Sequence, residues 1–527
     1  MISDEHRGGG ARVVATDGLS AEPRSGTAMR AVATGGMMLA TTMNSLDATI
    51  ANVALPHMQG SLSAGQDQIT WVLTSYIVAS AIMTPFSGWL ALKIGRKPLF
   101  LFSIAAFIGA SILCGIATTL PEMVLFRLLQ GFAGAGMMPI SQAAILDLWP
   151  QRLMPRVMAM WSAVIMVGPI LGPTLGGLLT EHFSWRWVFY VNVPVGALAF
   201  VLVYLTLEPD RGGQQRPFDF LGFSALVLCT GAIQLMADRG PSQDWFDSRE
   251  IWIYAVVALG GLHVFLIQTL TAPHPFFHRA LFADRNLVTT AIFMLIVAAM
   301  MFGTGALLPT FMQSLLGYSA LQSGLASMYR GLGSICAFAI VNAATRKLGA
   351  RQTMAIGLAI CFYSLWRMAH FDLLMTATPI KIAGFVQGIG MGLMFGPLSV
   401  LGFATLAPQH RTEAAVFSNV LRTMGSSLGI AVLQANLISQ SATAHERLAA
   451  GLNPSDPVIR WSLPHVFDGS AGALEALNGE VTRQSAMMSY DSIFAWMALL
   501  SLLLGPLILI LKPPHGAASE TLEVHAD

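Results

Sequence analysis

The sequence predicts an all-α polytopic membrane protein with about 14 transmembrane helices. Hydrophobic residues make up 54% of the 527 residues and charged residues only 11%, whereas about a quarter of an ordinary soluble domain is charged. A bilayer core about 30 Å thick needs roughly 20 apolar residues per helix, and apolar runs of that length recur along the chain. The predicted spans are 31–58, 69–92, 98–119, 121–149, 156–180, 185–207, 218–237, 251–271, 287–316, 320–346, 352–371, 379–406, 413–438 and 490–511.

The distribution of positive charge predicts that both termini are cytoplasmic. With the N-terminus inside, most Lys and Arg residues fall in inner segments, and the short outer loops after the first, third and ninth spans carry none. This is the positive-inside bias of membrane proteins, although Arg186, Arg239 and Arg249 lie near outer loops. Residues 1–30, polar and Gly-rich, are predicted to form a disordered cytoplasmic tail, and residues 512–527 a second tail. The net charge of +1 gives no reason to predict a nucleic-acid partner.

Two internal matches predict that the chain is built from two related halves. The string LKIGRKP after the second span resembles RKLGARQ after the tenth, and QGFAGAGMMPIS in the fourth span resembles QGIGMGLMFGPLS in the twelfth. Chance similarity among Gly-rich membrane helices is the alternative, but both matches relate spans that are eight apart. We therefore predict a six-helix bundle at 31–207, a two-helix insert at 218–271 and a second six-helix bundle at 287–511, which includes a long outer loop at 439–489.

The span 156–180 contains the string GPILGPTLGG, in which Gly168, Gly172 and Gly176 recur every four residues and line one face of a helix. Because glycines lack side chains, a neighbouring backbone can approach this face closely. Pro169 and Pro173 each remove a backbone hydrogen bond and bend a helix. We predict a bent helix that packs closely at an internal interface; dimerisation through the glycine face is the alternative.

These strings resemble motifs of the major facilitator superfamily. Its antiporter signature G-x-x-x-G-P-x-x-G-G is matched from Gly168 to Gly177, and RLLQG, from Arg127 to Gly131, resembles the motif of its fourth span. LDATIANVALP resembles the first-span signature of the fourteen-helix drug:proton antiporter branch, and WRWVFYVNVPVG and DRGPSQDWF are similar to EmrB-type multidrug exporters. The resemblance covers about residues 35 to 512. It implies two six-helix bundles, proton as the coupling ion, and neither a metal nor another cofactor. The antiporter motif comprises Gly168, Pro169, Gly172, Pro173, Gly176 and Gly177.

One motif of the superfamily is incomplete. The cytoplasmic loop motif G-x-x-x-D-[RK]-x-G-[RK]-[RK] reads GWLALKIGRK here, with Leu92 in the place of the acid. In the family that acid helps to latch the cytoplasmic side in the outward-facing state, so a latch by this residue is not expected. The remaining cations have an alternative role as positive-inside anchors. The residues that match the motif are Gly88, Lys93, Gly95, Arg96 and Lys97.

Asp47 lies deep within the first span, where an ionised carboxylate costs roughly 2.5–3.5 kcal/mol on insertion scales. A rise of 1.5 Å per residue places Asp47 roughly 13 Å below the end of its span at Pro56, and Arg127 roughly 9 Å below the outer end of the fourth span. The resemblance implies that these two spans are adjacent, so Arg127 can reach Asp47. Burial disfavours an ionised carboxyl and a nearby arginine favours it, so a change in this balance takes up or releases a proton. We predict that Asp47 and Arg127 couple proton movement; a structural ion pair or a direct substrate contact are the alternatives.

Other polar side chains within the spans are candidate substrate ligands, because polar groups at membrane depth usually have a function. Asp147 lies near the inner end of its span, where we expect a helix-end or loop contact. The predicted substrate-binding residues are Asn44, Gln130, Arg330, Asn419 and Arg422.

The resemblance implies export of small hydrophobic or amphipathic drugs or toxic metabolites from a bacterial-type inner membrane, by alternating access and in exchange for protons. It also implies a periplasmic adaptor and an outer-membrane channel as partners, with residues 439–489 as a candidate docking surface. A narrow-range exporter of a single metabolite or lipid is the first alternative. A membrane-embedded enzyme is a second, although the spans contain no histidine pair, nucleophile motif or phosphate loop. A channel is the third alternative, but the antiporter motif argues against it.

Overall fold

The computed structural model describes residues 26–69, 71–150, 152–209, 217–240, 243–452 and 471–511, and within these ranges it contains helices and no strand. Most of the predicted tail 1–30, all of the tail 512–527 and the middle of the predicted outer loop lie outside the described residues. The end of the first predicted tail belongs to the first helix, which begins at Thr27.

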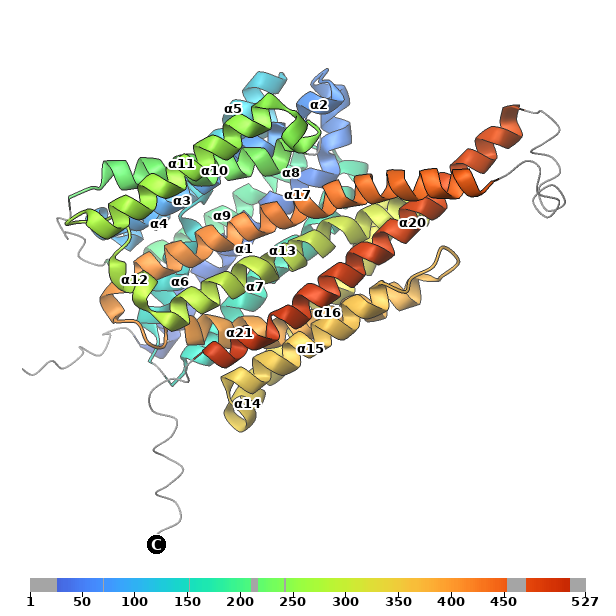
Figure 1. Ribbon diagram of the computed structural model, residues 1–527. Coiled ribbons are helices and arrows are strands. Elements are labelled where there is room, and N and C mark those ends of the chain that lie inside the picture. Colours follow the sequence, from blue (N-terminus) through green and yellow to red (C-terminus); the bar gives the residue numbers. More distant parts are fainter. Residues whose placement is uncertain are drawn as a thin grey trace, which may run out of the picture.

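Each predicted span coincides with a long helix or with two consecutive helices (Figure 1). Three of these are α1 (Thr27–Ser61), α7 (Met154–His182) and α15 (Ala350–Met368). The other 11 spans are the ones that, within the described chain, are long and apolar enough to cross a membrane. They are α3 (Trp71–Ile94), α4 (Arg96–Ile116), α5 (Leu120–Gly134) with α6 (Met137–Leu148), α8 (Trp187–Tyr190) with α9 (Asn192–Thr206), α10 (Phe220–Arg239), α11 (Arg249–Thr271), α13 (Arg285–Ser314), α14 (Ala320–Leu348), α16 (Ala377–Phe403), α17 (Arg411–Gly451), and α20 (Ala471–Leu503) with α21 (Gly505–Ile510). The predicted all-α polytopic architecture is confirmed.

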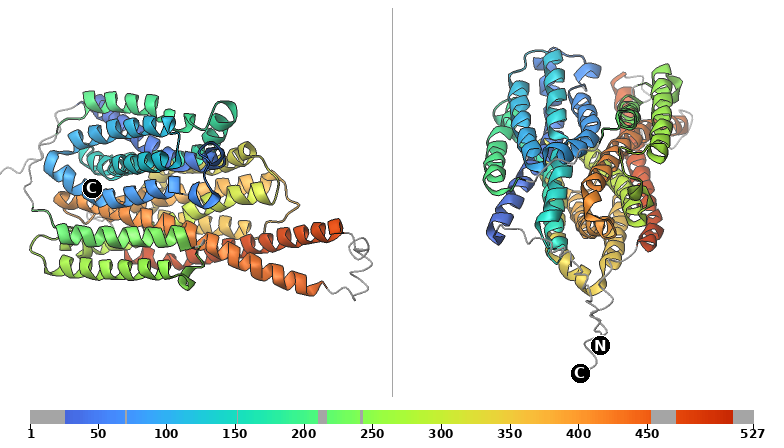
Figure 2. Two further views of the ribbon diagram at one scale, coloured as in Figure 1. Left: turned by 90° about the horizontal axis from the view of Figure 1, so that it is seen from above. Right: turned by 90° about the vertical axis from the view of Figure 1, so that its left-hand side faces the viewer.

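Helix packing repeats along the chain. In the N-terminal half, from α1 to α9, α1 packs along α7, α3 along α5, and α4 along both α5 and α9. In the C-terminal half, from α13 to α21, α13 packs along α17, α14 along α16, and α15 along both α16 and α20. The two halves lie side by side in both views of Figure 2. The turns after α3 and α14 also match, because Gly95 and Gly349 have φ of 94° and 87°, a conformation that favours glycine.

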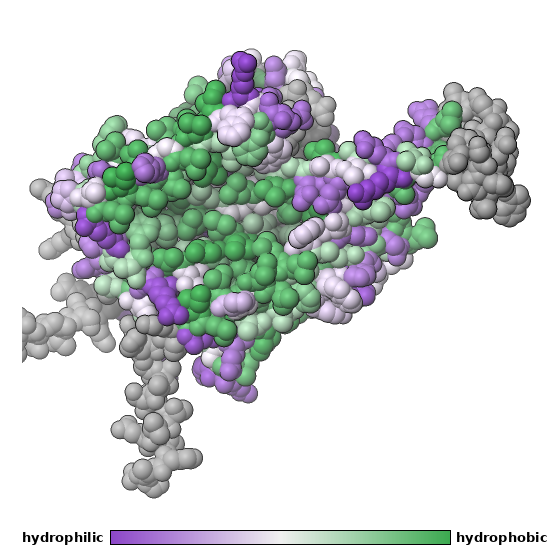
Figure 3. All heavy atoms as spheres, viewed as in Figure 1, coloured by the Kyte–Doolittle hydropathy of each residue, from purple (hydrophilic) through white to green (hydrophobic). Residues whose placement is uncertain are grey.

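The helices α10 and α11 form a hairpin that covers the seam between the halves. They pack on each other, and α10 also lies against α3 of the N-terminal half and α17 of the C-terminal half. The exposed side of α11 is apolar and includes Trp252, Val256 and Leu259. Figure 3 shows this hairpin and the neighbouring helices as a broad hydrophobic band with polar residues at both ends, as expected for a surface in contact with lipid.

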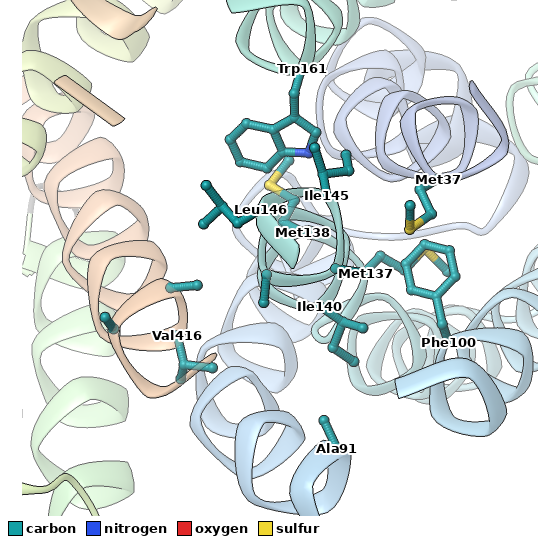
Figure 4. Packing of buried hydrophobic residues seen from close by; sticks show 14 of the residues in the cluster. Met37, Ala91, Phe100, Met137, Met138, Ile140, Ile145, Leu146, Trp161 and Val416 are labelled. Atoms are coloured by element: carbon teal, nitrogen blue, oxygen red, sulfur yellow. The ribbon is translucent and has the colours of Figure 1, made fainter. Parts of the chain in front are cut away.

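Buried apolar side chains join the two halves at one end of the molecule. We call it the basic end, since Arg96, Lys97 and Arg411 lie there. One cluster includes Met138 of α6 and Val416 of α17, and Figure 4 shows Val416 on the side of α17 that faces α6. Two other clusters lie within single halves, one around Phe189 and the other around Phe311 and Phe494. The halves are therefore packed tightly at the basic end.

Two helices run farther than predicted. The predicted spans end at residue 438 and begin again at 490, whereas α17 continues to Gly451 and α20 begins at Ala471. The 41 residues of α17 correspond to about 62 Å, about twice the thickness of a bilayer core. The ends of α17 and α20 project from the body opposite the basic end (Figure 1). The prediction was wrong here because these added turns are polar, and an apolar run marks only the part of a helix that is in contact with lipid or core.

Candidate proton and substrate sites

Asp47 and Arg127 form an ion pair in the interior of the N-terminal half. Arg127 Nη1 lies 2.6 Å from Asp47 Oδ2, and neither side chain is exposed. Asp47 lies 14 residues from the end of α1 at Ser61, which is about 21 Å along the helix axis. This depth exceeds the predicted value because α1 continues for a further turn after Pro56. The predicted contact between Asp47 and Arg127 is confirmed.

Two amide side chains complete the surroundings of the carboxylate. Gln130 Nε2 donates to Asp47 Oδ1 at 3.0 Å, and Asn192 Nδ2 donates to the same oxygen at 2.7 Å. Both amides lie within hydrogen-bond distance of Ser111 Oγ, and Gln130 Oε1 accepts from Arg127 Nη1 at 2.7 Å. Gln130 was predicted to bind substrate, and the structure places it in the buried network around Asp47.

The guanidinium of Arg127 lies between two aromatic rings. Its central carbon is 4.3 Å from the ring centroid of Tyr76 and 5.7 Å from that of Phe189, and such contacts stabilise a desolvated cation. Arg127 Nε donates to the carbonyl oxygen of Val72. The hydroxyl of Tyr76 donates to Asn44 Oδ1 at 2.8 Å. Asn44 was also predicted to bind substrate, and it is engaged within the N-terminal half.

Three members of this network were not among the predicted site residues. Asn192 stands in the string WRWVFYVNVPVG, so an amide near the start of a predicted span was an available signal. Ser111 and Tyr76 gave no comparable signal, because serine in a membrane helix commonly bonds to its own backbone and tyrosine is common near membrane interfaces.

Local sequence explains the position of Arg127. Thr119 and Glu122 form a capping box at the start of α5, which satisfies backbone donors there and fixes where the helix begins. Farther along α5, a Cβ on Gly131 would collide with the carbonyl oxygen of Tyr76. Because this position has no side chain, α5 can approach α3 closely enough to place Arg127 against the ring of Tyr76.

The glycines of the antiporter motif pack against the helix that carries Asp47. A Cβ on Gly168 would lie 2.6 Å from Ser45 Oγ, and a Cβ on Gly172 would collide with Thr49 Oγ1. A Cβ on Gly176 would lie 2.7 Å from a backbone oxygen of α1. Thr49 Oγ1 also donates to the carbonyl oxygen of Gly168 at 3.2 Å. The predicted close packing at an internal interface is confirmed.

The rest of the motif is also within α7. Gly177 is buried. Pro169 and Pro173 belong to the helix, but their side chains lie outside the part of the chain that the structure describes. The bend expected from the two prolines stays a prediction.

Asn419 and Arg422 lie where the two halves meet. Asn419 Nδ2 donates to Gln142 Oε1 at 3.1 Å, and Arg422 Nη2 lies 2.8 Å from Met138 Sδ. Asn419, Arg422, Gln142 and Trp161 line a cavity of about 20 Å³. Ligand pockets usually measure about 300–1,000 Å³, so the halves are closed around this cavity.

Arg330 lies elsewhere, within the C-terminal half. Its Nη1 donates to the carbonyl oxygen of Met301 at 3.3 Å and to Thr304 Oγ1 at 3.2 Å. The predicted substrate ligands therefore fall in three places: the network around Asp47 and Tyr76, the interface between the halves, and the interior of the C-terminal half.

The basic end contains a link between the halves that does not need an acid at Leu92. Arg96 Nη1 lies 2.6 Å from Asp147 Oδ2, and Arg411 Nη1 lies 3.3 Å from Asp147 Oδ1. Arg96 belongs to α4 and Arg411 to α17, so one carboxylate at the end of α6 contacts both halves. The predicted helix-end contact of Asp147 is confirmed.

Other residues of the loop motif also make defined contacts. Gly88 packs against α17, where a Cβ would lie 2.6 Å from Val416 Cγ2. The ammonium of Lys93 lies 4.9 Å from the ring centroid of a tryptophan one turn earlier in α3, and Lys97 Nζ donates to a backbone carbonyl of α9 at 2.8 Å. The loop motif therefore positions α3 and α4 against both halves.

The sequence profile of the Major Facilitator Superfamily matches residues 37–430. The chain belongs to this superfamily. It is 33% identical to the multidrug export protein EmrB of Escherichia coli over 497 residues, which cover 92% of this chain and 96% of that protein. It is 35% identical to the EmrB of Haemophilus influenzae over 490 residues, which cover 91% and 95% of the two chains. These matches make the chain a membrane transporter of the EmrB-like type rather than an enzyme.

A solved structure supports the same fold. The human organic anion transporter MFSD10 superposes with a TM-score of 0.55 over 90% of this chain and 99% of its own, at 12% sequence identity. At that identity the likeness concerns the fold alone. The major facilitator fold expected from the sequence motifs is confirmed.

Proposed function

We propose that this transporter exports small hydrophobic or amphipathic compounds in exchange for protons, with Asp47 as the residue that binds the proton. The similarity to the multidrug export protein EmrB of two bacteria supports the export of drugs. The observation that carries the proton assignment is the fully buried Asp47–Arg127 ion pair. Moving a carboxylate into a membrane interior is costly, and a protonated carboxyl avoids most of that cost.

The network around Asp47 can hold either protonation state. The ionised carboxylate accepts from Arg127, Gln130 and Asn192. Among the described residues, Arg127 Nη2 and Asn192 Oδ1 are buried and have no hydrogen-bond partner. If the amide of Asn192 turned over, its oxygen would be an acceptor for the proton of a protonated Asp47.

The proton site is connected to the interface between the halves through α7. Ser45 lies two residues before Asp47, and its Oγ donates to the carbonyl oxygen of Ile165 at 3.0 Å. Ile165 lines the cavity that also contains Asn419 and Arg422. A change in the charge of Asp47 that moves α1 therefore acts directly on a wall of this cavity. We infer that substrate binds here when the halves separate, and that proton binding and substrate binding favour different arrangements of the halves.

Alternating access requires the contacts at the basic end to break. In the structure, Asp147 connects Arg96 to Arg411, and the apolar cluster that contains Met138 and Val416 joins α6 to α17. Separation of these groups would open the cavity toward the basic end. We assign the basic end to the cytoplasm on the positive-inside bias, with both termini on that side and the chain in the inner membrane.

The projecting ends of α17 and α20 then lie on the periplasmic side. They are the surface on which a periplasmic adaptor, and through it an outer-membrane channel, would bind. Polar helical turns beyond the bilayer support this assignment, since lipid contact does not require them.

Proton movement in liposomes tests this function. Purified protein is reconstituted with a pH-sensitive dye inside, and a panel of hydrophobic dyes and weak acids is added. We expect several chemically different compounds to move protons through the wild type, and none to do so through Asp47→Asn. Asp372→Asn is the matched control, because Asp372 is an exposed acid in the C-terminal half. A response to one compound alone would contradict multidrug export, and proton movement through Asp47→Asn would contradict the assignment of Asp47.

A further inference from the structure

The C-terminal half contains a buried polar site that matches the Asp47 site in position but lacks an acid. A Cβ on Gly388 of α16 would collide with the carbonyl oxygen of Arg330, just as one on Gly131 of α5 would collide with that of Tyr76. At each glycine the backbone of one helix therefore touches the backbone of the next, and α16 is aligned with α14 as α5 is aligned with α3. Arg330 therefore occupies the position in the C-terminal half that Tyr76 occupies in the N-terminal half.

The glutamines that precede these glycines extend the match. Gln130 donates to Asp47 of α1, and Gln387 Nε2 lies 3.4 Å from Thr304 Oγ1 of α13. Thr304 thus stands where the N-terminal half has its carboxylate. The second site has a cation, an amide and a hydroxyl, but no negative charge.

The charge of Arg330 is not compensated within the described chain. Arg330 is 8% exposed, and its only hydrogen bonds to described residues run from Nη1 to Met301 and Thr304. No described carboxylate lies within ion-pair distance of it. It is ten residues, about 15 Å, from the start of α14 at Ala320, which places the guanidinium near mid-membrane. Gln387 Oε1 is also buried without a partner.

An unpaired cation at this depth is costly, and an anion that enters the site would remove that cost. Arg330 Nη2 and Nε are free of described partners, and a guanidinium can bind a carboxylate through two parallel hydrogen bonds. Arg330 contacts Met301, and Gly305 lies beside its Nη2. Phe302, between these two residues on α13, lines the cavity at the interface of the halves. The site therefore adjoins the proposed substrate cavity.

We propose that Arg330 binds the acidic group of anionic amphipathic substrates, with Thr304 and Gln387 as neutral neighbours. This inference rests on the proposed export function and specifies one class of substrate, the organic carboxylates. A protein with this site is expected to distinguish a carboxylate from a neutral or cationic compound of the same shape.

Equilibrium binding to purified protein in detergent tests the proposal. The probes share one ring system and differ in charge: naphthylacetate, naphthylacetamide and naphthylethylamine. We expect Arg330→Met to weaken naphthylacetate binding roughly 10- to 100-fold and to leave the amide and amine within about two-fold of the wild type. Arg330→Lys, which retains the charge but not the fork of donors, should give an intermediate loss. Arg367→Gln is the control, since Arg367 is an exposed arginine of the same half.

Several results would overturn the proposal. Unchanged naphthylacetate binding in Arg330→Met would do so, as would an equal loss for all three probes, which would indicate a packing role. Wild-type protein that binds naphthylacetate no better than naphthylacetamide would also overturn it. Displacement of naphthylacetate by phosphatidylglycerol would indicate a site for lipid headgroups instead.

A second variant tests the proposal if Arg330→Met does not fold, and a transport measurement separates this proposal from the export function. If Arg330→Met does not fold, Gly305→Val crowds the guanidinium from the neighbouring helix and should weaken naphthylacetate binding selectively; retention of that binding would contradict the proposal. In liposomes, naphthylethylamine-driven proton movement should persist in Arg330→Met. If no compound moves protons through the wild type, the export function is refuted. If compounds move protons but carboxylates are not preferred, only the proposal for Arg330 is refuted.

Discussion

Removal of Arg127 is expected to destabilise the protein through the carboxylate that it leaves behind. Asp47 and Arg127 are fully buried and 2.6 Å apart, and breaking such a pair by removing one partner costs about 3–5 kcal/mol. In Arg127→Met, Asp47 still accepts from Gln130 and Asn192, so the lower part of that range applies. In the double variant Asp47→Asn/Arg127→Met, neither charge remains, and the loss should be smaller than the sum of the single losses by on the order of 1–3 kcal/mol.

Equilibrium unfolding in mixed micelles, followed by tryptophan fluorescence, measures these free energies. The loss in Arg127→Met should become smaller at acid pH, because protonation of Asp47 removes the unpaired charge and stabilises the folded state relative to neutral pH. The double variant should show no such dependence from this site. Additive losses in the double variant, or a loss in Arg127→Met that does not change with pH, would show that Asp47 and Arg127 do not stabilise each other as a buried ion pair.

Three other predictions concern packing and the link between the halves. Gly172→Ala places a methyl group against Thr49 and should lower the free energy of unfolding by about 1–3 kcal/mol, whereas Gly35→Ala, with open space around it, should not; equal melting temperatures would contradict this. Asp147→Asn should cost at most about 1 kcal/mol, because the pair is partly exposed, but should speed hydrogen exchange at the start of α17, and unchanged exchange would show that the link is unimportant. Gly95→Ala forces a side chain into φ 94° and should cost about 1–3 kcal/mol, measured by thermal unfolding; a neutral effect would contradict the strained turn.

The sequence was sufficient to predict the helices and one contact of the site. Recurring apolar runs predicted the position of every span, because lipid contact requires them. The cost of burying a charge drew attention to Asp47, and the resemblance to the superfamily, which implies that the first and fourth spans are adjacent, paired it with Arg127. The amides that donate to Asp47 could not be predicted as its partners. A single polar residue such as Asn192 forms no periodic pattern, and its contact with Asp47 depends on how α9 packs against α1. The same is true of Asp147, whose partners come from α4 and α17, far apart in sequence.

The clearest error concerns the length of the helices that continue through polar sequence. The turns of α17 beyond residue 438 continue a helix through polar sequence, which hydropathy does not distinguish from a loop. Asn44 and Gln130 have the polarity of substrate ligands, yet both are engaged within the N-terminal half. Their hydrogen bonds to Tyr76 and Asp47 hold them inside the N-terminal half, an arrangement that depends on how the helices pack, and a contact with substrate stays a prediction.

Proton release on substrate binding tests most directly the claim that Asp47 exchanges a proton for substrate. Purified protein in weakly buffered detergent solution is titrated with a compound that the liposome panel identifies as transported, and the pH and the bound compound are measured together. We predict that wild type and Asp372→Asn release protons in proportion to the compound bound, and that Asp47→Asn binds the compound without release. Proton release by Asp47→Asn equal to that of the wild type would show that another group carries the proton and that the Asp47–Arg127 pair is structural.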